Sequence, residues 1–405
     1  MNDRTAPGPT AWLVATLALL SAVSPLATDM YLPAFPQMQG DLETTAASVQ
    51  LTLTTFMVGL ALGQLLIGPL SDALGRRGPL LVGTLVCLAA SIACALAPNV
   101  AVLVAMRFVQ GMSGAAGIVL ARAVITDLTR GPRTARLMSL MMVLGGLMPA
   151  LAPSIGGGIL EVGDWRTIFW VVCALVAVMV VLVVAVVPES LPVERREPGG
   201  LRRLVAGAGE VLRNRTYLFA TGVFTLGFSA FFGYISASPF VLQNILGLDE
   251  LQFAVVFGGN SLGIMATGAL AIRLAGRVPI LPVVGVGLAL LATGAVALLV
   301  LALMGPTLVP TLVAMFVTAA SIGLFMGNSS ALAMQALRSS AGTGSAILGA
   351  AQFLLAGLIS PIVGINGEND AVPMGAVLVV GSALAWLSYL ALRRETARND
   401  APTAG

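Results

Sequence analysis

The dominant feature of this chain is a series of twelve apolar runs, each close to the length that crosses a lipid bilayer. A transmembrane α-helix needs about 20 apolar residues, because each residue adds about 1.5 Å along the axis. In hydrocarbon every backbone N–H and C=O must be bonded within the protein, so runs of this length predict helices. The predicted spans are residues 11–33, 46–70, 79–97, 100–124, 134–160, 165–187, 215–240, 251–275, 279–303, 306–334, 342–366 and 371–392. The sequence therefore predicts an all-α membrane protein.

Composition supports this class and excludes others. Of the 405 residues 58% are apolar and 10% are charged, whereas a soluble domain carries about 25% charged residues. There is no histidine, and the three cysteines, Cys87, Cys94 and Cys173, lie in apolar runs without the spacing of metal ligands. We therefore expect no enzyme activity, no metal, no cofactor other than a proton gradient, and no nucleic-acid partner.

The placement of charge predicts the orientation. Of the 21 basic residues, all arginine, 19 lie at the termini or in the connections after every second span. The opposite connections hold eight acids: Asp41, Glu43, Glu161, Asp164, Asp249, Glu250, Glu368 and Asp370. The positive-inside rule then places both termini in the cytoplasm, which requires an even number of spans. We expect a multi-pass protein of the bacterial cytoplasmic membrane.

The chain divides into two halves. Residues 188–214 form the longest polar stretch, rich in proline, glycine and charge, with six predicted spans on each side. We therefore predict a first half over residues 1–187, a cytoplasmic linker over 188–214 and a second half over 215–405. A Gly-Arg pair follows both the second span, at Gly75-Arg76, and the eighth, at Gly276-Arg277. This echo is typical of transporters built from parallel repeats with a site between the halves.

The connection after the second span carries the sequence GPLSDALGRR over residues 68–77. It resembles the signature of the major facilitator superfamily, in which a glycine, an aspartate and a Gly-Arg-Arg stand at fixed offsets. The matching positions, which the resemblance implies are gating residues, are Gly68, Asp72, Gly75, Arg76 and Arg77. The resemblance also implies that Asp72 contacts the start of the eleventh span, near Gly342 and Thr343, and latches the cytoplasmic side. The alternative is an ordinary basic loop that only sets topology.

Two further stretches resemble motifs of this superfamily. Residues 107–111 (RFVQG) are similar to its second motif, an arginine followed by Gln-Gly. Residues 145–157 resemble the antiporter motif of drug exporters, in which prolines bend the helix and glycines allow a close neighbour. Met148 and Ala152 replace two glycines of that pattern, so a packing kink unrelated to the direction of transport stays open. The gating candidates here are Pro149, Pro153, Gly156 and Gly157.

Asp29 is the most informative single residue. A carboxylate within a span is energetically expensive and indicates function. It lies in the sequence TDMYLP, residues 28–33, which resembles the first span of Bcr/CflA-type drug exporters. At 1.5 Å per residue Asp29 lies about 6 Å, and Arg107 about 10 Å, below the same membrane edge. We expect the two charges to approach each other and to couple transport to protons. A static ion pair, or a carboxylate that caps a helix end, is the alternative.

The resemblance implies proton-coupled efflux of lipophilic, chloramphenicol- or bicyclomycin-like compounds by a monomer. A proton-coupled symporter or metabolite exporter on the same fold is the alternative, but such proteins often place several charged groups in the cavity. A membrane enzyme lacks a nucleophile–base pair here, and a channel does not explain the two halves. Apolar, flexible and aromatic side chains suit lipophilic substrates. The candidates for substrate contact are Tyr31, Met142, Phe231, Tyr234, Asn260 and Asn328.

Overall fold

The computed structural model describes residues 10–196, 200–337 and 340–400, and a few side chains within these ranges are left undescribed. In this part the chain forms twelve long α-helices and two short ones, without strands. The first half contains α1 (Ala11–Asp29), α2 (Phe35–Asp41), α3 (Ala46–Leu74), α4 (Arg77–Ala95), α5 (Val100–Leu128), α6 (Pro132–Leu160) and α7 (Trp165–Val186). After α8 (Gly200–Val211), the second half contains α9 (Arg215–Pro239), α10 (Glu250–Leu274), α11 (Ile280–Met304), α12 (Leu308–Gln335), α13 (Ala341–Ile359) and α14 (Val372–Asp400).

The twelve-span prediction of an all-α membrane fold is confirmed. Among the described residues, eleven helices are long and apolar enough to cross a membrane, and α6 contributes a shorter described apolar stretch, Leu151–Leu160. Most helix ends lie within four residues of the predicted ones. The first span differs, because a 3-10 turn (Leu32–Ala34) follows Asp29 and leads into α2. Pro33 and Pro36 lack a backbone N–H, so a regular α-helix cannot run straight through them.

Side-chain caps fix several helix starts. The Asn99 side chain accepts a hydrogen bond from the Val102 N–H at 3.0 Å and begins α5. Asp164 caps α7 and Asp249 caps α10, and in each case the third helical residue returns a bond to the cap. These bonds satisfy N–H groups that have no partner inside a helix. Two of the acids that distinguish one side of the membrane therefore also set helix boundaries.

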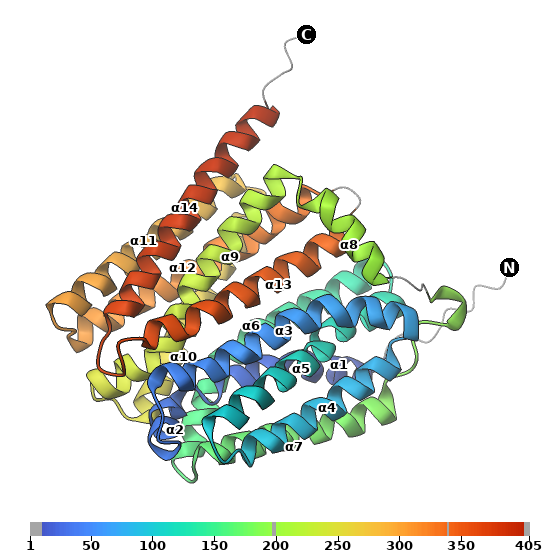
Figure 1. Cartoon of the computed structure of the whole chain (residues 1–405). Helices are drawn as coiled ribbons and strands as arrows, with labels where there is room; N and C mark the ends of the chain where they lie inside the picture. The colour runs from blue at the N-terminus through green and yellow to red at the C-terminus, as the bar shows by residue number, and fades with distance from the viewer. Residues whose placement is uncertain (1–9, 197–199, 338–339, 401–405) are drawn as a thin grey trace.

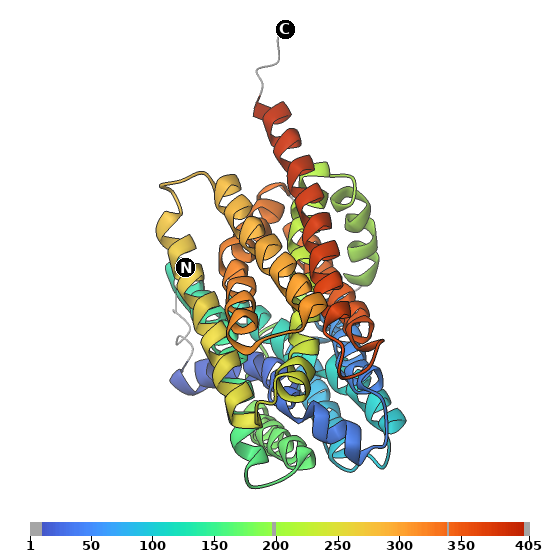
Figure 2. The ribbon, with the colours of Figure 1, turned by 90° about the vertical axis from the view of Figure 1, so that its left-hand side faces the viewer.

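The helices lie in two groups along the chain. In both ribbon views the blue-to-green helices α1–α7 lie together, mostly below the yellow-green-to-red helices α9–α14 (Figures 1 and 2). The halves meet where α3 packs against α13 and α6 against α10. The predicted linker contains a 3-10 turn (Val193–Arg195) and α8. Helix α8 contacts both halves, with Gly200 against Pro69 of α3 and Gly207 against Thr343 of α13.

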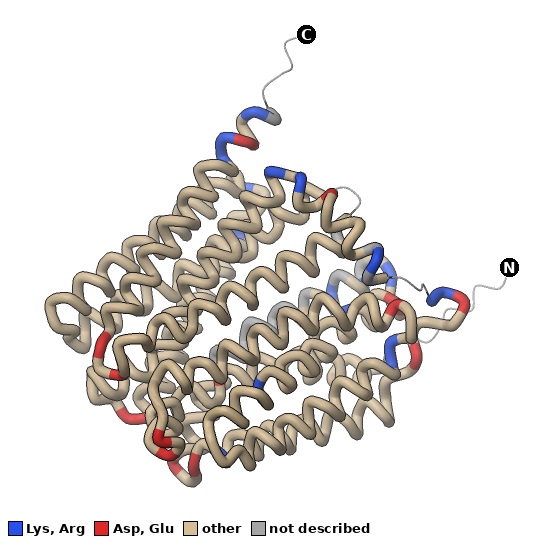
Figure 3. The backbone as a smooth tube through the Cα atoms, viewed as in Figure 1, with Lys and Arg blue, Asp and Glu red and all other residues tan. Residues whose placement is uncertain are grey.

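Charge is segregated between the two ends of the helices. Figure 3 shows one end with acidic residues and almost no arginine, and another with most of the arginines and further acidic residues among them; almost no charge lies between. We call the first the acidic end; it carries the eight acids of the connections identified above. We call the other the arginine-rich end, where Arg76, Arg196 and Arg277 lie in or beside connections. The apolar belt between them is the part that a bilayer must cover.

Close backbone approach holds α3 against α5. A methyl group at Gly111 would overlap the backbone carbonyl of Phe56, which leaves no room for any larger residue. Lipid tails are as apolar as the helix surfaces, so helices in a membrane associate through tight packing rather than through burial of apolar surface. Gly111 is therefore a structural requirement of this helix pair.

We predict that Gly111→Ala lowers the free energy of unfolding by about 1–3 kcal/mol, as overpacking does in tight cores. Gly158→Ala is the matched control, because Gly158 is also helical and a methyl group there meets nothing within 4 Å. Thermal unfolding of the two purified variants in detergent measures the difference. Equal melting temperatures would contradict this account of the α3–α5 contact.

Candidate functional site

Asp29 is the last residue of α1 and is buried, with 8% of its surface exposed. None of the ion pairs in the described part of the chain includes it. Its neighbour Met30 is pressed against α6, because the Met30 carbonyl occupies the place where a Cβ of Gly156 would be. The backbone next to Asp29 therefore packs against α6, and no described ion pair joins a cation to the carboxylate.

Arg107 in α5 is fully buried. Its Nη1 donates to the Ala27 carbonyl at 3.0 Å and to Oε1 of Gln110 at 2.7 Å. Its Nε and Nη2 have no hydrogen-bond partner among the described residues. Two rings cover the guanidinium, Phe56 at 4.2 Å and Tyr31 at 4.5 Å from their centroids. Aromatic faces attract a desolvated cation, so these rings replace part of its lost hydration.

The structure brings Arg107 to the helix that carries Asp29 and into electrostatic range of its carboxylate, but no described ion pair joins the two groups. The guanidinium binds the backbone two residues earlier, at Ala27. Gln110 extends this contact, since its Nε2 donates to Ser91 of α4 at 2.7 Å. Gln110 belongs to the RFVQG stretch, which by itself predicts no role for this residue, and nothing in the sequence distinguishes Ser91. A lone serine in an apolar run carries no signal of its own.

The substrate candidates are divided among several places. Tyr31 lies in the first half, where its hydroxyl is 3.1 Å from Oγ1 of Thr52 and its ring packs against Phe169. Asn328 bonds its own helix through the Leu324 carbonyl at 2.7 Å. The side chain of Met142 lies outside the described residues. No described contact joins Tyr31 or Asn328 to the aromatic cluster of the second half.

Phe231, Tyr234 and Asn260 do lie together. Asn260 donates to the Tyr234 hydroxyl at 2.6 Å, and the rings of Phe231 and Tyr234 are 5.3 Å apart. Asn260 also lines an open groove of about 300 Å³ between α10 and α12, whose other walls are apolar and include Phe316. A small apolar groove with one amide suits a lipophilic molecule with a single polar group.

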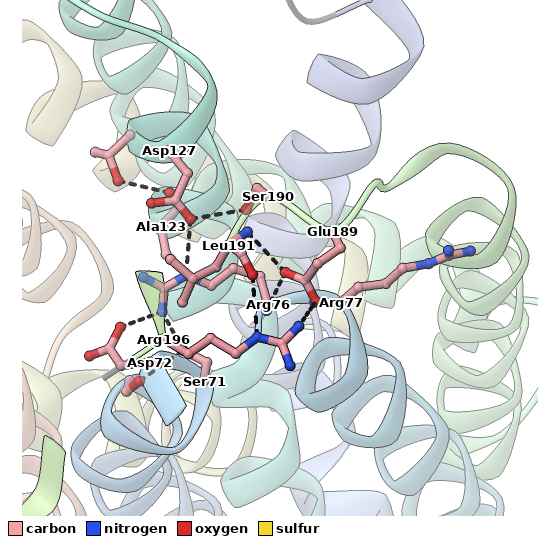
Figure 4. Close-up of polar contacts among 12 residues, drawn as sticks. Ser71, Asp72, Arg76, Arg77, Ala123, Asp127, Glu189, Ser190, Leu191 and Arg196 are labelled. Atoms are coloured by element: carbon pink, nitrogen blue, oxygen red, sulfur yellow. Dashed lines mark hydrogen bonds and ion pairs between the residues drawn. The ribbon is translucent and has the colours of Figure 1, made fainter. Parts of the chain in front are cut away.

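A second polar cluster occupies the arginine-rich end of the first half (Figure 4). Arg76 donates from Nε to Asp127 at 3.0 Å and from Nη1 to Asp72 at 2.6 Å. Burial lowers the pKa of Arg76, but its bonds to Asp127 and Asp72 raise it by more, so the net pKa lies above the ordinary value. Asp127 also accepts from Ser190 at 2.9 Å. The cluster thus joins the ends of α3 and α5 to the start of the linker.

Glu189 caps α4 from outside that helix. Its Oε1 accepts the Arg76 N–H at 2.8 Å and its Oε2 accepts the Arg77 N–H at 3.3 Å. Arg196 of the linker lies 3.6 Å from the same carboxylate. Glu189 and Asp127 were not among the residues that the sequence predicted for a site. Their position beside the ends of spans indicates only that they lie near the membrane surface. Their bonding partners belong to other segments, which the sequence does not show.

The gating candidates near this cluster take different roles. Gly75 ends α3 with a φ of 97°, a left-handed conformation that favours glycine, and lets the chain turn into α4. Arg77 donates to the Val184 carbonyl at 2.8 Å. Asp72 pairs with Arg76, and no described contact joins it to the start of α13. There Thr343 faces Gly207 of α8, and the contact between Asp72 and α13 stays a prediction.

The gating candidates of α6 lie where helices cross. Gly156 faces Met30 of α1, and a Cβ on Gly157 would lie 3.0 Å from the Glu250 carbonyl of α10. Adjacent glycines therefore contact opposite halves of the molecule. Pro153 is buried one turn earlier. The side chain of Pro149 lies outside the described residues, and Gly68 of α3 is in ordinary contact distance of Val119.

Hydrogen bonds join the two halves directly at the acidic end. Gln39 of α2 donates to Glu368, and Gln243 donates to the Pro33 carbonyl at 3.0 Å. Further bonds link α3 to α9 and α13, and α6 to α10. Within the described ranges, every hydrogen bond that directly connects residues 10–187 with residues 215–400 lies on this side. The halves are thus fastened at one end.

We predict that Glu189→Gln costs about 1 kcal/mol at neutral pH, comparable to the loss of a helix N-cap. Burial raises the pKa of Glu189, but the N–H groups of Arg76, Leu191 and Arg77 and the charge of Arg196 together lower it by more, so the net pKa is depressed. A carboxylate whose pKa is lower in the folded state than in the unfolded state stabilises the fold at pH values above the unfolded-state pKa. This contribution is lost as the pH falls through the folded-state pKa. Melting temperatures of the two proteins should therefore converge in acid. A pH-independent difference would contradict an ionic cap.

Comparison with known proteins is consistent with this geometry. The sequence profile of the Major Facilitator Superfamily matches residues 17–361. An uncharacterised MFS-type transporter, YdgK of Bacillus subtilis (strain 168), is 38% identical over 385 residues, 94% of each chain. The bicyclomycin resistance protein homolog of Haemophilus influenzae is 28% identical, covering 95% of this chain and 96% of that one.

A similar fold occurs in the crystal structure of a bacterial homolog of the human lysosomal transporter Spinster. That structure has a TM-score of 0.74 and 16% identity, covering 96% of this chain and 99% of that one. The match to residues 17–361 and the full-length relative at 38% identity place the protein among transporters rather than enzymes. The chain belongs to the Major Facilitator Superfamily.

Proposed function

We propose that this protein exports small lipophilic compounds from the cytoplasm in exchange for protons that enter through Asp29. The observation that carries the proposal is a buried carboxylate that no described ion pair joins to a cation, next to the contact between α1 and α6. A carboxylate within a membrane span is retained when it has a function, and reversible protonation is the simplest one.

The positive-inside rule supports the direction. It would place the arginine-rich end in the cytoplasm and the acidic end outside. The described bonds between the halves lie at the acidic end, so this conformation would be closed to the outside. Export by alternating access then requires that these bonds break and that the arginine-rich end closes instead.

The glycine pair of α6 supports coupling between the proton site and that motion. Gly157 touches α10 of the second half, and Gly156 touches Met30 beside Asp29. A shift of α6 against α10 would therefore change the surroundings of the carboxylate. Hydration favours the charged form of a carboxylate and burial favours the neutral form, so such a shift would bind or release a proton.

The substrate class rests on two supports. The walls of the second-half cluster are aromatic and uncharged, with Asn260 and Tyr234 as its polar groups. The relative from Haemophilus influenzae is named a bicyclomycin resistance protein homolog. Both favour lipophilic compounds with few polar groups, and chloramphenicol is a suitable first probe. We expect the transporter to work as a monomer in the bacterial cytoplasmic membrane.

We predict that everted vesicles with an acidic lumen accumulate chloramphenicol or bicyclomycin, and that Asp29→Asn reduces the uptake to the level of vesicles without the protein. The amide of asparagine cannot bind and release a proton at physiological pH, so the pH gradient can no longer drive substrate uptake. Glu161→Gln is the matched control, because it removes an exposed carboxylate at the same end of the molecule and should leave uptake intact.

Two outcomes contradict the proposal. Uptake that survives Asp29→Asn excludes Asp29 as the proton carrier. Proton-driven loss of preloaded substrate from the same vesicles, in place of uptake, indicates that substrate and protons move together and favours a symporter.

A further inference from the structure

Gln50 of α3 joins the two halves inside the protein rather than at its surface. It is fully buried, and its Nε2 donates to the Ser236 carbonyl of α9 at 3.1 Å. The backbone carbonyl of Gln50 accepts a hydrogen bond from Oγ of Ser360 at 3.3 Å. The Ser360 hydroxyl also lies 2.6 Å from the Ser236 hydroxyl. One residue of the first half is therefore bonded to two segments of the second.

The position of Gln50 makes it the innermost of the amides at this interface. Gln39 and Gln243, which also bridge the halves, are only partly buried, so water can replace their bonds when the halves separate. A buried hydrogen bond is stronger, because the surroundings have a low dielectric constant and no water competes for its groups. Thr54 of α3 forms another buried bridge, because its hydroxyl donates to the Gly357 carbonyl at 2.7 Å. Among the described residues of the first half, however, Gln50 alone is bonded to two segments of the second half.

The same side chain is not fully satisfied. Its Oε1 is buried and has no hydrogen-bond partner among the described residues, and it lies against the Cα of Gly364, where a Cβ would overlap it. An unpaired buried oxygen favours a conformation that admits water. The closed state is therefore held by one amide bond and opposed by the other atom of the same amide, as a reversible contact requires.

We propose that Gln50 is the residue that holds the acidic end closed, and that its bond to Ser236 breaks each time this end opens. This assignment rests on the alternating-access function proposed above. It gives Gln50 a positioning role in the conformational equilibrium, separate from the protonation of Asp29 and from substrate binding.

The test measures the separation of the halves in the full-length protein in nanodiscs, without substrate or pH gradient. Spin labels at Val162→Cys and Asn369→Cys report it, since both positions are exposed at the acidic end of opposite halves and the three native cysteines are buried. Gln50→Met keeps the length of the side chain and removes the amide. We expect the ratio of long to short distances to rise on the order of tenfold, the effect of losing one buried hydrogen bond.

Two further variants make the result specific. Gly364→Ala leaves Gln50 in place but pushes a methyl group into its Oε1, and it should open the acidic end in the same way. Gln64→Met makes the same substitution on the same helix, against Gly349 of α13, where no described hydrogen bond joins the halves. It should leave the distances unchanged.

Unchanged distances in both Gln50→Met and Gly364→Ala would overturn the proposal, and so would equal opening by Gln64→Met. The result does not depend on transport. Opening by Gln50→Met in a protein that exports no drug would support the latch and contradict the proposed function. Drug export through Asp29 with unchanged distances would contradict the latch alone.

Discussion

In a helix that crosses a bilayer no water is present to bond the backbone N–H and C=O groups, so the protein must satisfy all of them. In lipid the helix also gains little free energy by burying apolar surface against a neighbour. The helices of this protein therefore depend on close contact. At Gly111 the absence of a side chain lets α5 lie directly on the Phe56 carbonyl of α3. The same device recurs at Gly156 and Gly157, where it brings α6 against both halves. Packing that stabilises the fold thereby also connects the halves to the segment that holds Asp29.

The buried guanidinium of Arg107 is the main exception to this apolar interior. Two aromatic rings, the Ala27 carbonyl and Gln110 stabilise it. These hydrogen bonds and aromatic contacts replace part of the hydration that the guanidinium loses on burial, and no described ion pair joins Arg107 to Asp29. An ion pair would hold the carboxylate in its charged form. Its absence from the described ion pairs is compatible with the proton exchange that we propose.

The two ends of the molecule are organised by different interactions. At the arginine-rich end, ionic and charge-assisted bonds centred on Arg76 and Glu189 hold the first half to the start of the linker. At the acidic end, neutral amides such as Gln50 and Gln243 join the two halves. A neutral amide bond is weaker than a charge-assisted one, and it exchanges more readily for water. Of the described bonds between the halves, that of Gln39 to Glu368 involves a carboxylate, and the others join neutral groups. The proposed cycle would therefore break mainly neutral bonds.

The sequence by itself determined the number of long helices, nearly all their ends and the charge difference between the two ends. Span length and polar connections are set locally by the thickness of the bilayer and by its cost for charge. Only the tertiary structure decided that Arg107 meets Ala27, that Asp72 pairs with Arg76, and that Gln50 bridges the halves. Helices that are apolar on nearly every face have no amphipathic period to show which side meets which neighbour. Their rotation and partners are fixed by contacts between segments distant in the chain.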